Sequence, residues 1–209
     1  MQNLADCRLY GILDLSYVVE SNAEAVTAAM IEGGVDVIQL RAKKATVSKI
    51  IDLAGRLHQI TAPAGVPLVV NDHAEVAAQV LVEGIHVGQD DDSIATARQK
   101  AGRELIVGKS SHSLEQAIAA QAEGADYIGF GPIFPTPTKP DYVAIGIEDI
   151  KRVHAAVKLP IFCIGGIKID NLGEIIAAGA KRVTIVSGLL KAADVAKYAR
   201  ACKALLQPE

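Results

Sequence analysis

The sequence predicts a single-domain TIM (β/α)8 barrel of parallel strands, with its active site at the C-terminal strand ends. Three observations predict it. A short run rich in Val and Ile, an Ala-rich helical segment and a Gly-containing turn follow one another repeatedly along the 209 residues. The unit occurs eight times. Polar residues gather after the strand-like runs, whereas the turns before them hold mostly Gly, Ala and Pro.

The strands are expected where Val and Ile form short apolar runs bounded by polar residues or glycine. Branched aliphatic runs of this kind are typical of parallel strands that are buried on both faces. The expected strands are, in order, Leu9–Asp14, Val35–Arg41, Pro67–Asp72, Gly84–Gln89, Leu105–Ser110, Tyr127–Gly131, Pro160–Ile164 and Arg182–Ser187.

The helices are expected between these runs, where apolar residues recur at helical spacing, as at Ile175, Ile176 and Ala180. Ser113 and Gln116 form a candidate capping box, and Asp170 or Asn171 is the expected start of the seventh helix. Glycine is common just past a helix. The glycines expected at helix ends are Gly33, Gly34, Gly65, Gly84, Gly102, Gly124 and Gly179.

Strict alternation of strand and helix implies a parallel sheet with right-handed crossovers. An open doubly wound sheet is the alternative to a closed barrel. Eight units favour the barrel, and no strand is followed by the spaced glycines of a dinucleotide site. Since the chain has no linker or shift in composition, we expect residues 1–209 to form a single barrel and catalytic domain.

Composition narrows the class of protein. The chain is 50% hydrophobic but only 4% aromatic, so aliphatic side chains must fill the core. A net charge of −3 gives no reason to expect nucleic acid or an anionic membrane as a partner. The N-terminus has no signal-peptide pattern, and no apolar segment approaches the roughly 18 residues of a membrane span. We therefore expect a cytoplasmic protein that acts on small molecules.

The cysteines are odd in number and widely spaced. Cys7, Cys163 and Cys202 lack the pairing of a metal site, and none follows a strand beside an activating base. We expect them to be packing residues in a reducing compartment.

Seven consecutive strands end in polar or small residues that must meet at one mouth of the barrel. This asymmetry predicts the active site. The residues concerned are Gln39–Lys44, Asn71, Asp72, Gln89–Asp91, Ser110–His112, Thr136–Lys139, Gly165, Gly166, Ser187 and Gly188.

Two of these endings indicate a phosphate site. Gly165-Gly166 and Ser187-Gly188 follow the seventh and eighth strands and leave backbone N–H groups accessible to an anion. This is the usual phosphate position of the fold. The alternative is that the glycines serve only to make tight turns.

Two carboxylates follow neighbouring strands. Asp72 and Asp91 would suit Mg²⁺, which takes few protein ligands and completes its shell with water and substrate phosphates. The alternative is that either aspartate is a helix N-cap. Asp90 is the less favoured neighbour, although the sequence does not separate it from Asp91.

Basic and imidazole side chains also converge on the mouth. Arg41, Lys43 and Lys139 would form a cationic wall around a diphosphate, or else a solvated charged loop. His112 is either a base or a residue that orients a loop. We expect His86, which lies within a strand, to be partly buried and hydrogen-bonded.

Taken together, these motifs resemble those of the thiamine-phosphate synthase family along nearly the whole chain. The stretch Tyr127–Lys139 is the most specific of them. The matching segments are Gln39–Lys43, Asn71–Asp72, Gly84–Asp91, Gly108–His112, Tyr127–Lys139, Gly165–Ile167 with Asn171, and Val186–Ser187. The first strand departs from the usual Leu-Tyr-Leu-Val-Thr-Asp, so no role is assigned to Tyr10 or Asp14. Ala42 stands where an acidic residue is frequent.

The resemblance implies a transferase that joins hydroxymethylpyrimidine diphosphate to thiazole phosphate, with Mg²⁺ as cofactor. It implies that Asp72 and Asp91 bind the metal. The remaining roles that it implies are Gln39 and Asn71 for the pyrimidine; Arg41, Lys43, Ser110 and Lys139 for the diphosphate, as catalytic residues; and Thr136, Thr138, Gly166, Val186 and Ser187 for the thiazole phosphate.

The implied chemistry agrees with the residues. Diphosphate departs from a methylene on an electron-rich aminopyrimidine, so a carbocation can form before the thiazole nitrogen attacks. Such a site needs cations and good positioning. It does not need an activated Ser or Cys, and we identify none at the mouth.

Three alternatives remain. A thiazole tautomerase on the same barrel would have a histidine where this chain has Pro132. A non-catalytic sensor of a thiamine precursor would not need Asp72, Asp91 and Lys139 together. An isomerase or aldolase barrel needs a base or a Schiff-base lysine, and we expect no lysine inside a strand. A homodimer through the outer helices is a further expectation.

Overall fold

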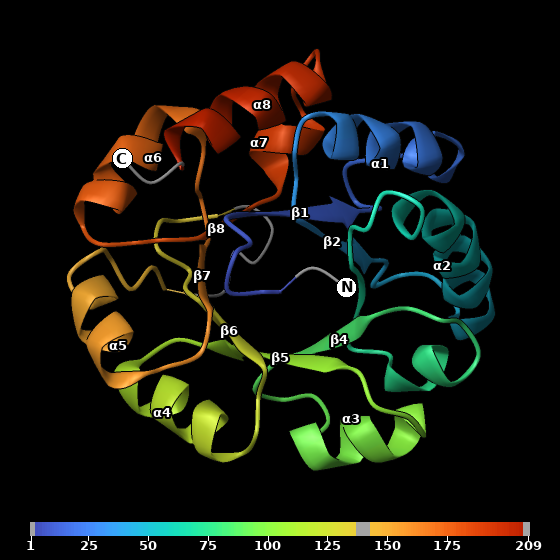
Figure 1. Cartoon of the computed structure of the whole chain (residues 1–209), viewed down its shortest axis with the longest axis horizontal. Coiled ribbons are helices and arrows are strands. Elements are labelled where there is room, and N and C mark those ends of the chain that lie inside the picture. The colour runs from blue at the N-terminus through green and yellow to red at the C-terminus, as the bar shows by residue number, and fades with distance from the viewer. Residues whose placement is uncertain (1–2, 137–142, 207–209) are drawn as a thin grey trace.

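The computed structural model describes residues 3–136 and 143–206 and is a closed barrel of parallel strands in the order β1 to β8 (Figure 1). Each strand pairs with the next in the chain, and β8 pairs with β1. The strands are β1 Leu9–Asp14, β2 Val37–Arg41, β3 Leu68–Asn71, β4 Gly84–Val87, β5 Ile106–Ser111, β6 Tyr127–Phe130, β7 Ile161–Ile164 and β8 Val183–Ile185. The predicted barrel is confirmed.

The helices form a ring around the strands (Figure 1). The α-helices are α1 Ala23–Glu32, α2 Val47–Thr61, α3 Ile94–Ala101, α4 Leu114–Ala122, α5 Ile150–Ala156, α6 Ile169–Ala177, α7 Ser187–Leu190 and α8 Val195–Leu205. The 3-10 helices are η1 Glu20–Asn22 and η2 Ala74–Ala78. The unit between β3 and β4 therefore departs from the predicted pattern, because the short η2 takes the place of an α-helix.

Several predicted element boundaries are wrong. No helix ends at Gly84, which begins β4 as the predicted strand did; a Cβ there would lie 2.9 Å from the Ile106 carbonyl oxygen of the next strand. α6 begins at Ile169, before both residues expected to start it. The strand predicted to end at Ser187 stops at Ile185, because Ser187 is already the first residue of α7.

The capping box is only half confirmed. Ser113 Oγ accepts a hydrogen bond from the Gln116 backbone N–H at 3.2 Å, as predicted. The Gln116 side chain does not return to Ser113 but accepts from the backbone N–H of His112 at 2.7 Å. The first turn of α4 is thus tied to the loop that carries His112.

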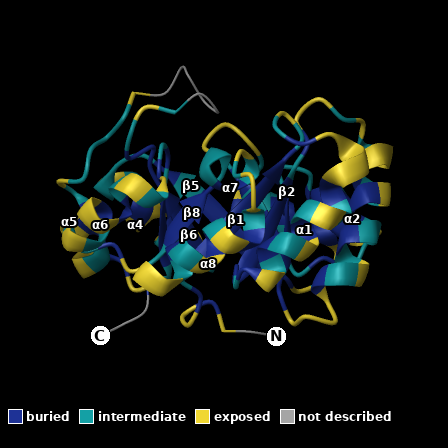
Figure 2. Ribbon diagram, turned by 90° about the horizontal axis from the view of Figure 1, so that it is seen from above, coloured by how far each residue is buried: buried dark blue, intermediate teal, exposed yellow. Residues whose placement is uncertain are grey.

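Apolar side chains form two separate layers of core. The larger layer lies between the strands and the helices, and Figure 2 shows its buried residues beneath helices whose outer faces are exposed. The smaller layer lies inside the barrel and includes Tyr10, Tyr127 and Phe162. Phe162 packs edge-on against both tyrosines, with ring centroids 5.3 Å and 5.7 Å away. Three of the eight Tyr and Phe residues thus pack against one another in the barrel interior.

The cysteines are buried and free, which confirms their expected role as packing residues. Burial raises the pKa of Cys163 to about 12 and that of Cys202 to about 11. Their thiols are therefore protonated and unreactive near neutral pH. No helix in the part of the chain that the structure describes is long and apolar enough to cross a membrane.

The partly buried His154 of α5 should make the free energy of unfolding depend on pH in acid. Burial, helped by Lys181 and Arg182, lowers the pKa of His154 to about 4, and its buried Nε2 has no hydrogen-bond partner. Between its ordinary pKa of 6.5 and about 4, the unfolded chain binds a proton that the folded chain does not. We expect the free energy of unfolding to fall by about 1–2 kcal/mol through this group as the pH drops across that range.

Urea unfolding followed by circular dichroism at pH 7.5, 6 and 4.5 measures this effect. His154→Gln should lose stability more gradually than the wild type over the same range. An equal loss in the two proteins would contradict the assignment.

Candidate active site

A pocket opens at the carboxyl ends of the strands and collects residues from all around the barrel. The predicted site residues that line it are Gln39, Arg41, Asn71, Ser110, Thr136, Gly166, Val186 and Ser187. Lys43, Asp72 and Asp91 follow β2, β3 and β4 at the same end of the barrel. Thr138 and Lys139 lie outside the described residues.

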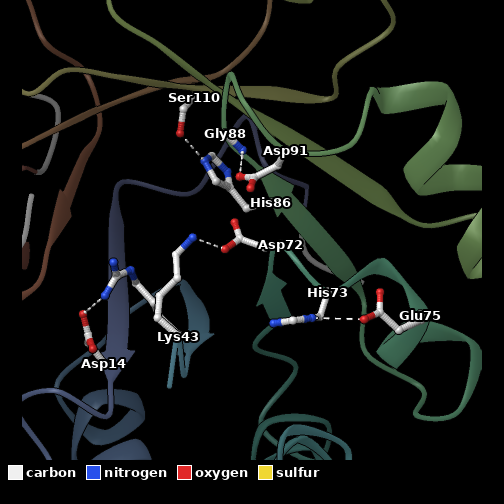
Figure 3. A network of polar contacts seen from close by, with 10 residues as sticks. Asp14, Lys43, Asp72, His73, Glu75, His86, Gly88, Asp91 and Ser110 are labelled. Atoms are coloured by element: carbon white, nitrogen blue, oxygen red, sulfur yellow. Dashed lines mark hydrogen bonds and ion pairs between the residues drawn. The ribbon is translucent and has the colours of Figure 1, made fainter. Parts of the chain in front are cut away.

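The aspartates Asp72 and Asp91 lie side by side. Figure 3 shows the Asp72 carboxylate between Lys43, with which it forms an ion pair, and Asp91. Asp91 Oδ2 accepts a hydrogen bond from the backbone N–H of Gly88 at 2.7 Å. Ser93, not Asp91, caps α3, and the residue before η2 is His73, not Asp72. The N-cap alternative is therefore wrong for both.

The backbone at Asp72 holds its carboxylate in place. Asp72 adopts a φ of 65°, and its N–H donates to the His86 carbonyl at 2.8 Å. A left-handed conformation is uncommon for residues other than glycine, although aspartate tolerates it better than most. The chain thus turns sharply at the end of β3 and keeps Asp72 beside β4.

Burial and the neighbouring Asp91 carboxyl raise the pKa of Asp72, whereas Lys43 lowers it. Two carboxylates in contact repel each other when both are ionised, and a nearby cation relieves that repulsion. Among the described residues, no group of three or more His, Cys, Asp or Glu side chains could hold a metal ion. A metal at Asp72 and Asp91 would therefore take its other ligands from water or substrate.

Arg41 is held from behind by Asp14. Arg41 Nη1 donates to Asp14 Oδ2 at 2.6 Å, and the Asp14 side chain is only 2% exposed. Asp14 Oδ1 also accepts from the N–H and Oγ of Ser16, at 2.9 Å and 2.7 Å. The alternative of a solvated loop is therefore wrong for Arg41, whose side chain is 14% exposed, while Lys43 at 45% extends further into solvent.

The glycines after β7 have a packing role that the sequence reading did not include. Gly165 and Gly166 adopt φ values of 104° and 63°. A Cβ on Gly166 would lie 2.7 Å from both Phe134 Cβ and the Pro135 carbonyl oxygen. The backbone of this loop thus packs directly against the loop that follows β6. Positive φ and close packing require glycine here whether or not an anion binds.

Ser187 is the first residue of α7 and lines the pocket together with Val186. Asn171 Nδ2 donates to the Gly166 carbonyl at 3.0 Å and joins α6 to the same region. The two predicted phosphate-binding ends, after β7 and β8, therefore border one pocket.

His112 lines the pocket as well, and its position favours one of its two expected roles. Its ring Nδ1 donates to the Gly131 carbonyl oxygen, and its backbone N–H donates to Gln116. Since a carbonyl oxygen only accepts, Nδ1 carries the proton. His112 joins the loops after β5 and β6, which is the loop-orienting role.

Tyr10, His86 and Tyr127 also line the pocket, although none of them was expected to take part in binding substrate. Alternate residues of a strand point to the same face, and these three side chains face the barrel interior as Gln39 and Arg41 do on β2. That alternation is the sequence signal that would have identified them. His86 is partly buried and hydrogen-bonded, as predicted, but it contacts Ser110 Oγ through Nε2 at 2.9 Å (Figure 3). Ser110 therefore has a histidine beside it, a neighbour that was not expected from the sequence.

The expectation that no lysine lies inside a strand is wrong, because Lys109 lies inside β5. Its side chain does not line the pocket, whereas its neighbour Ser110 does. Successive residues of a strand point to opposite faces, so Lys109 points away from the barrel interior. This lysine is not placed to form a Schiff base with a molecule in the pocket.

Comparison with known proteins finds similar sequences over nearly the whole chain. The family model described as thiamine monophosphate synthase matches residues 9–189. A thiamine-phosphate synthase of Chloroflexus aurantiacus is 42% identical over 205 residues, which cover 98% of this chain and 94% of that protein. One of Shouchella clausii is 40% identical over 201 residues, which cover 96% of each.

A solved structure of a related protein has the same fold. The thiamine phosphate pyrophosphorylase from Pyrococcus furiosus superposes with a TM-score of 0.88 and is 32% identical. The superposition covers 98% of this chain and 96% of that one. The similarity thus includes every strand whose end contributes to the pocket.

Proposed function

The chain belongs to the thiamine monophosphate synthase family and is an enzyme that condenses a pyrimidine diphosphate with a thiazole phosphate, and we propose that the mouth of its barrel carries this reaction with the help of Mg²⁺. One observation supports this assignment above all. The paired carboxylates of Asp72 and Asp91 lie beside Lys43 at the rim of a pocket that Arg41 and Ser110 line. Negative ligands for a cation and donors for an anion are thus adjacent.

The donor atoms present fit Mg²⁺. Asp72 and Asp91 offer oxygen ligands only, which is the preference of this ion. Burial and Asp91 raise the pKa of Asp72, so a cation in contact with both carboxylates would relieve an existing repulsion. When bound, Mg²⁺ supplies positive charge that stabilises the departing diphosphate.

The side chains divide between the two substrates. In this proposal Gln39 and Asn71 hold the pyrimidine, while Arg41, Lys43 and Ser110 contact the diphosphate together with Lys139. Gly166 and the backbone at Val186 and Ser187 hold the thiazole phosphate together with Thr136 and Thr138. Thr138 and Lys139 enter on the resemblance alone.

The reaction needs positive charge and positioning more than it needs a nucleophile on the protein. We infer that the carbon–diphosphate bond breaks first, because the aminopyrimidine stabilises the resulting cation, and that the thiazole nitrogen then attacks. Burial raises the pKa of Cys7 and Cys163 to about 12 and that of Cys202 to about 11, and the cysteines take no part. Arg41, fixed by Asp14, offers rigid N–H donors to the departing group.

Purified protein with both precursors and Mg²⁺ should release diphosphate and form thiamine phosphate, and chelation with EDTA should stop turnover. A coupled assay for diphosphate, with product identified by chromatography, measures this. Turnover that persists after removal of all divalent cations would contradict the role of Mg²⁺. Turnover of a thiazole carboxylate tautomer alone would instead support a tautomerase.

We also propose that residues 1–209 form one catalytic domain, that the protein works in the cytoplasm, and that it pairs as a homodimer through its outer helices. The buried free cysteines support a reducing compartment. Sedimentation equilibrium tests the homodimer: a mass near that of the 21.9 kDa chain would contradict it.

A further inference from the structure

A continuous chain of hydrogen bonds crosses the barrel interior from β2 to β5. Gln39 Nε2 donates to the Tyr10 hydroxyl at 3.0 Å, and the hydroxyls of Tyr10 and Tyr127 lie 2.9 Å apart. His86 contacts Tyr127 OH through Nδ1 at 3.0 Å and Ser110 Oγ through Nε2 at 2.9 Å. The chain joins Gln39, proposed for the pyrimidine, to Ser110, proposed for the diphosphate.

The middle of this chain is shielded from water. Tyr10 is 2% exposed, Tyr127 1% and Gln39 3%. Burial raises the pKa of both tyrosines, so each phenol keeps its proton. Buried polar groups in such a place depend on one another for their hydrogen bonds.

The strands leave room for this arrangement. A Cβ on Gly108 of β5 would lie 2.1 Å from Tyr127 Cζ and 2.5 Å from its hydroxyl. A Cβ on Gly129 would lie 3.3 Å from His86 Cε1. The glycine at position 108 therefore allows the Tyr127 hydroxyl to reach both Tyr10 and His86.

The donor at one end determines which group donates in each hydrogen bond from Gln39 to Ser110. The Gln39 amide nitrogen can only donate, so the Tyr10 oxygen accepts there, and its own proton goes to Tyr127. Tyr127 then donates to His86 Nδ1, which places the histidine proton on Nε2. Nε2–H donates to Ser110 Oγ, so the serine hydrogen remains for an acceptor in the pocket.

We propose that Tyr127 is a positioning residue, which fixes the tautomer of His86 so that the Ser110 hydroxyl donates its hydrogen to the diphosphate. This rests on the proposed function, in which Ser110 contacts the diphosphate. It also explains how a serine can sit against a histidine without being a nucleophile. His86 has its proton on the nitrogen that faces Ser110, and so it cannot accept the serine proton.

Tyr127→Phe tests the proposal, because it removes only the hydroxyl oxygen. Without it, His86 Nδ1 loses its donor, the other tautomer becomes accessible, and Ser110 can donate to His86 instead of to the diphosphate. We expect the affinity for inorganic diphosphate in the presence of Mg²⁺ to fall about tenfold by calorimetry. The KM for the thiazole phosphate should stay unchanged, which a general loss of structure would not allow.

Tyr10→Phe is the matched control, with the same loss of one hydroxyl from the same chain. It keeps the Tyr127 hydroxyl as a donor to His86 and removes only the hydrogen bond that directs the Tyr127 proton, so diphosphate affinity should fall less than it does in Tyr127→Phe. The KM for the pyrimidine diphosphate should rise, because Gln39 loses its acceptor. Equal effects of the two variants on diphosphate affinity would overturn the proposal.

A double variant that carries both Tyr127→Phe and Ser110→Ala tests whether Tyr127 acts through Ser110. If Tyr127 acts through Ser110, adding Tyr127→Phe to Ser110→Ala should cause no further loss of diphosphate affinity. Additive losses in the double variant would overturn the proposal.

The tautomer can be read without any substrate. Nitrogen-15 NMR of the folded wild type should show the His86 proton on Nε2, and a proton on Nδ1 would overturn the proposal even if Tyr127→Phe failed to fold. Failure of the proposed function would look different. The wild type would then release no diphosphate from the two precursors, while the His86 tautomer would remain as inferred.

Discussion

Asp91→Asn is expected to lower kcat for diphosphate release by about 10²–10³-fold, the largest effect on activity that we predict. The amide keeps the shape of the side chain and can still accept from the Gly88 N–H, which Asp91 Oδ2 now accepts at 2.7 Å. It removes one of the two negative charges that face each other at the rim. Mg²⁺ should then bind more weakly, so the Mg²⁺ concentration for half-maximal rate should rise. Initial rates at saturating substrates across a Mg²⁺ titration measure both changes.

Asp92→Asn is the matched control for charge. Asp92 is the next residue in the chain, but its carboxylate pairs with Lys100 Nζ at 2.7 Å on the surface. We expect its kcat and Mg²⁺ dependence to stay within about twofold of the wild type, since exposed ion pairs contribute little. Comparable losses in the two variants would show that the Asp72–Asp91 pair has no special role.

Gly166→Ala is expected to reduce stability by about 2–4 kcal/mol and to raise the KM for the thiazole phosphate more than tenfold. The residue has a φ of 63°, and its new Cβ would lie 2.7 Å from Phe134 Cβ and from the Pro135 carbonyl oxygen. Relief of these contacts requires the loops after β6 and β7 to separate. The proposed phosphate cradle lies between them. Urea unfolding and steady-state kinetics measure the two effects.

Gly173→Ala is the matched control, because it makes the same substitution in α6, seven positions along the chain. A Cβ there meets nothing within 4 Å, and the residue is exposed. Alanine in an exposed helix interior should stabilise the protein by about 0.5–1 kcal/mol and leave KM unchanged. If Gly166→Ala were as well tolerated as Gly173→Ala, the close packing of the two loops would be refuted.

Much of the fold could be predicted because each strand and helix carries its own local pattern. The strand predicted at Leu9–Asp14 is confirmed to the residue, and the others are correct to within three residues at each end. The errors arise where neighbours override the local pattern. Gly84 was expected both to start a strand and to end a helix. Only the strand start is correct, and the adjacent strand leaves no room for a side chain there. Likewise the Ala-rich sequence of η2 is typical of an α-helix, and its five residues are too few to distinguish an α-helix from a 3-10 helix.

The predicted site residues could be gathered from strand ends alone, but their partners could not. Lys43 was assigned to the diphosphate, and the structure pairs it with Asp72. Asp14 had no role, and it holds Arg41. A local sequence pattern carries no information on which side chain of another strand a given residue meets.

The amino-acid sequence by itself determined the barrel, the end at which the pocket opens and most of the polar residues that line it. These depend on the period of the apolar residues and on the order of strands, both of which are local. Only the tertiary structure decided which of those residues contact one another. Asp14 and Arg41 are 27 positions apart, and Tyr10 and Tyr127 are 117 apart. Contacts over such separations depend on the register of neighbouring strands and on closure of the barrel.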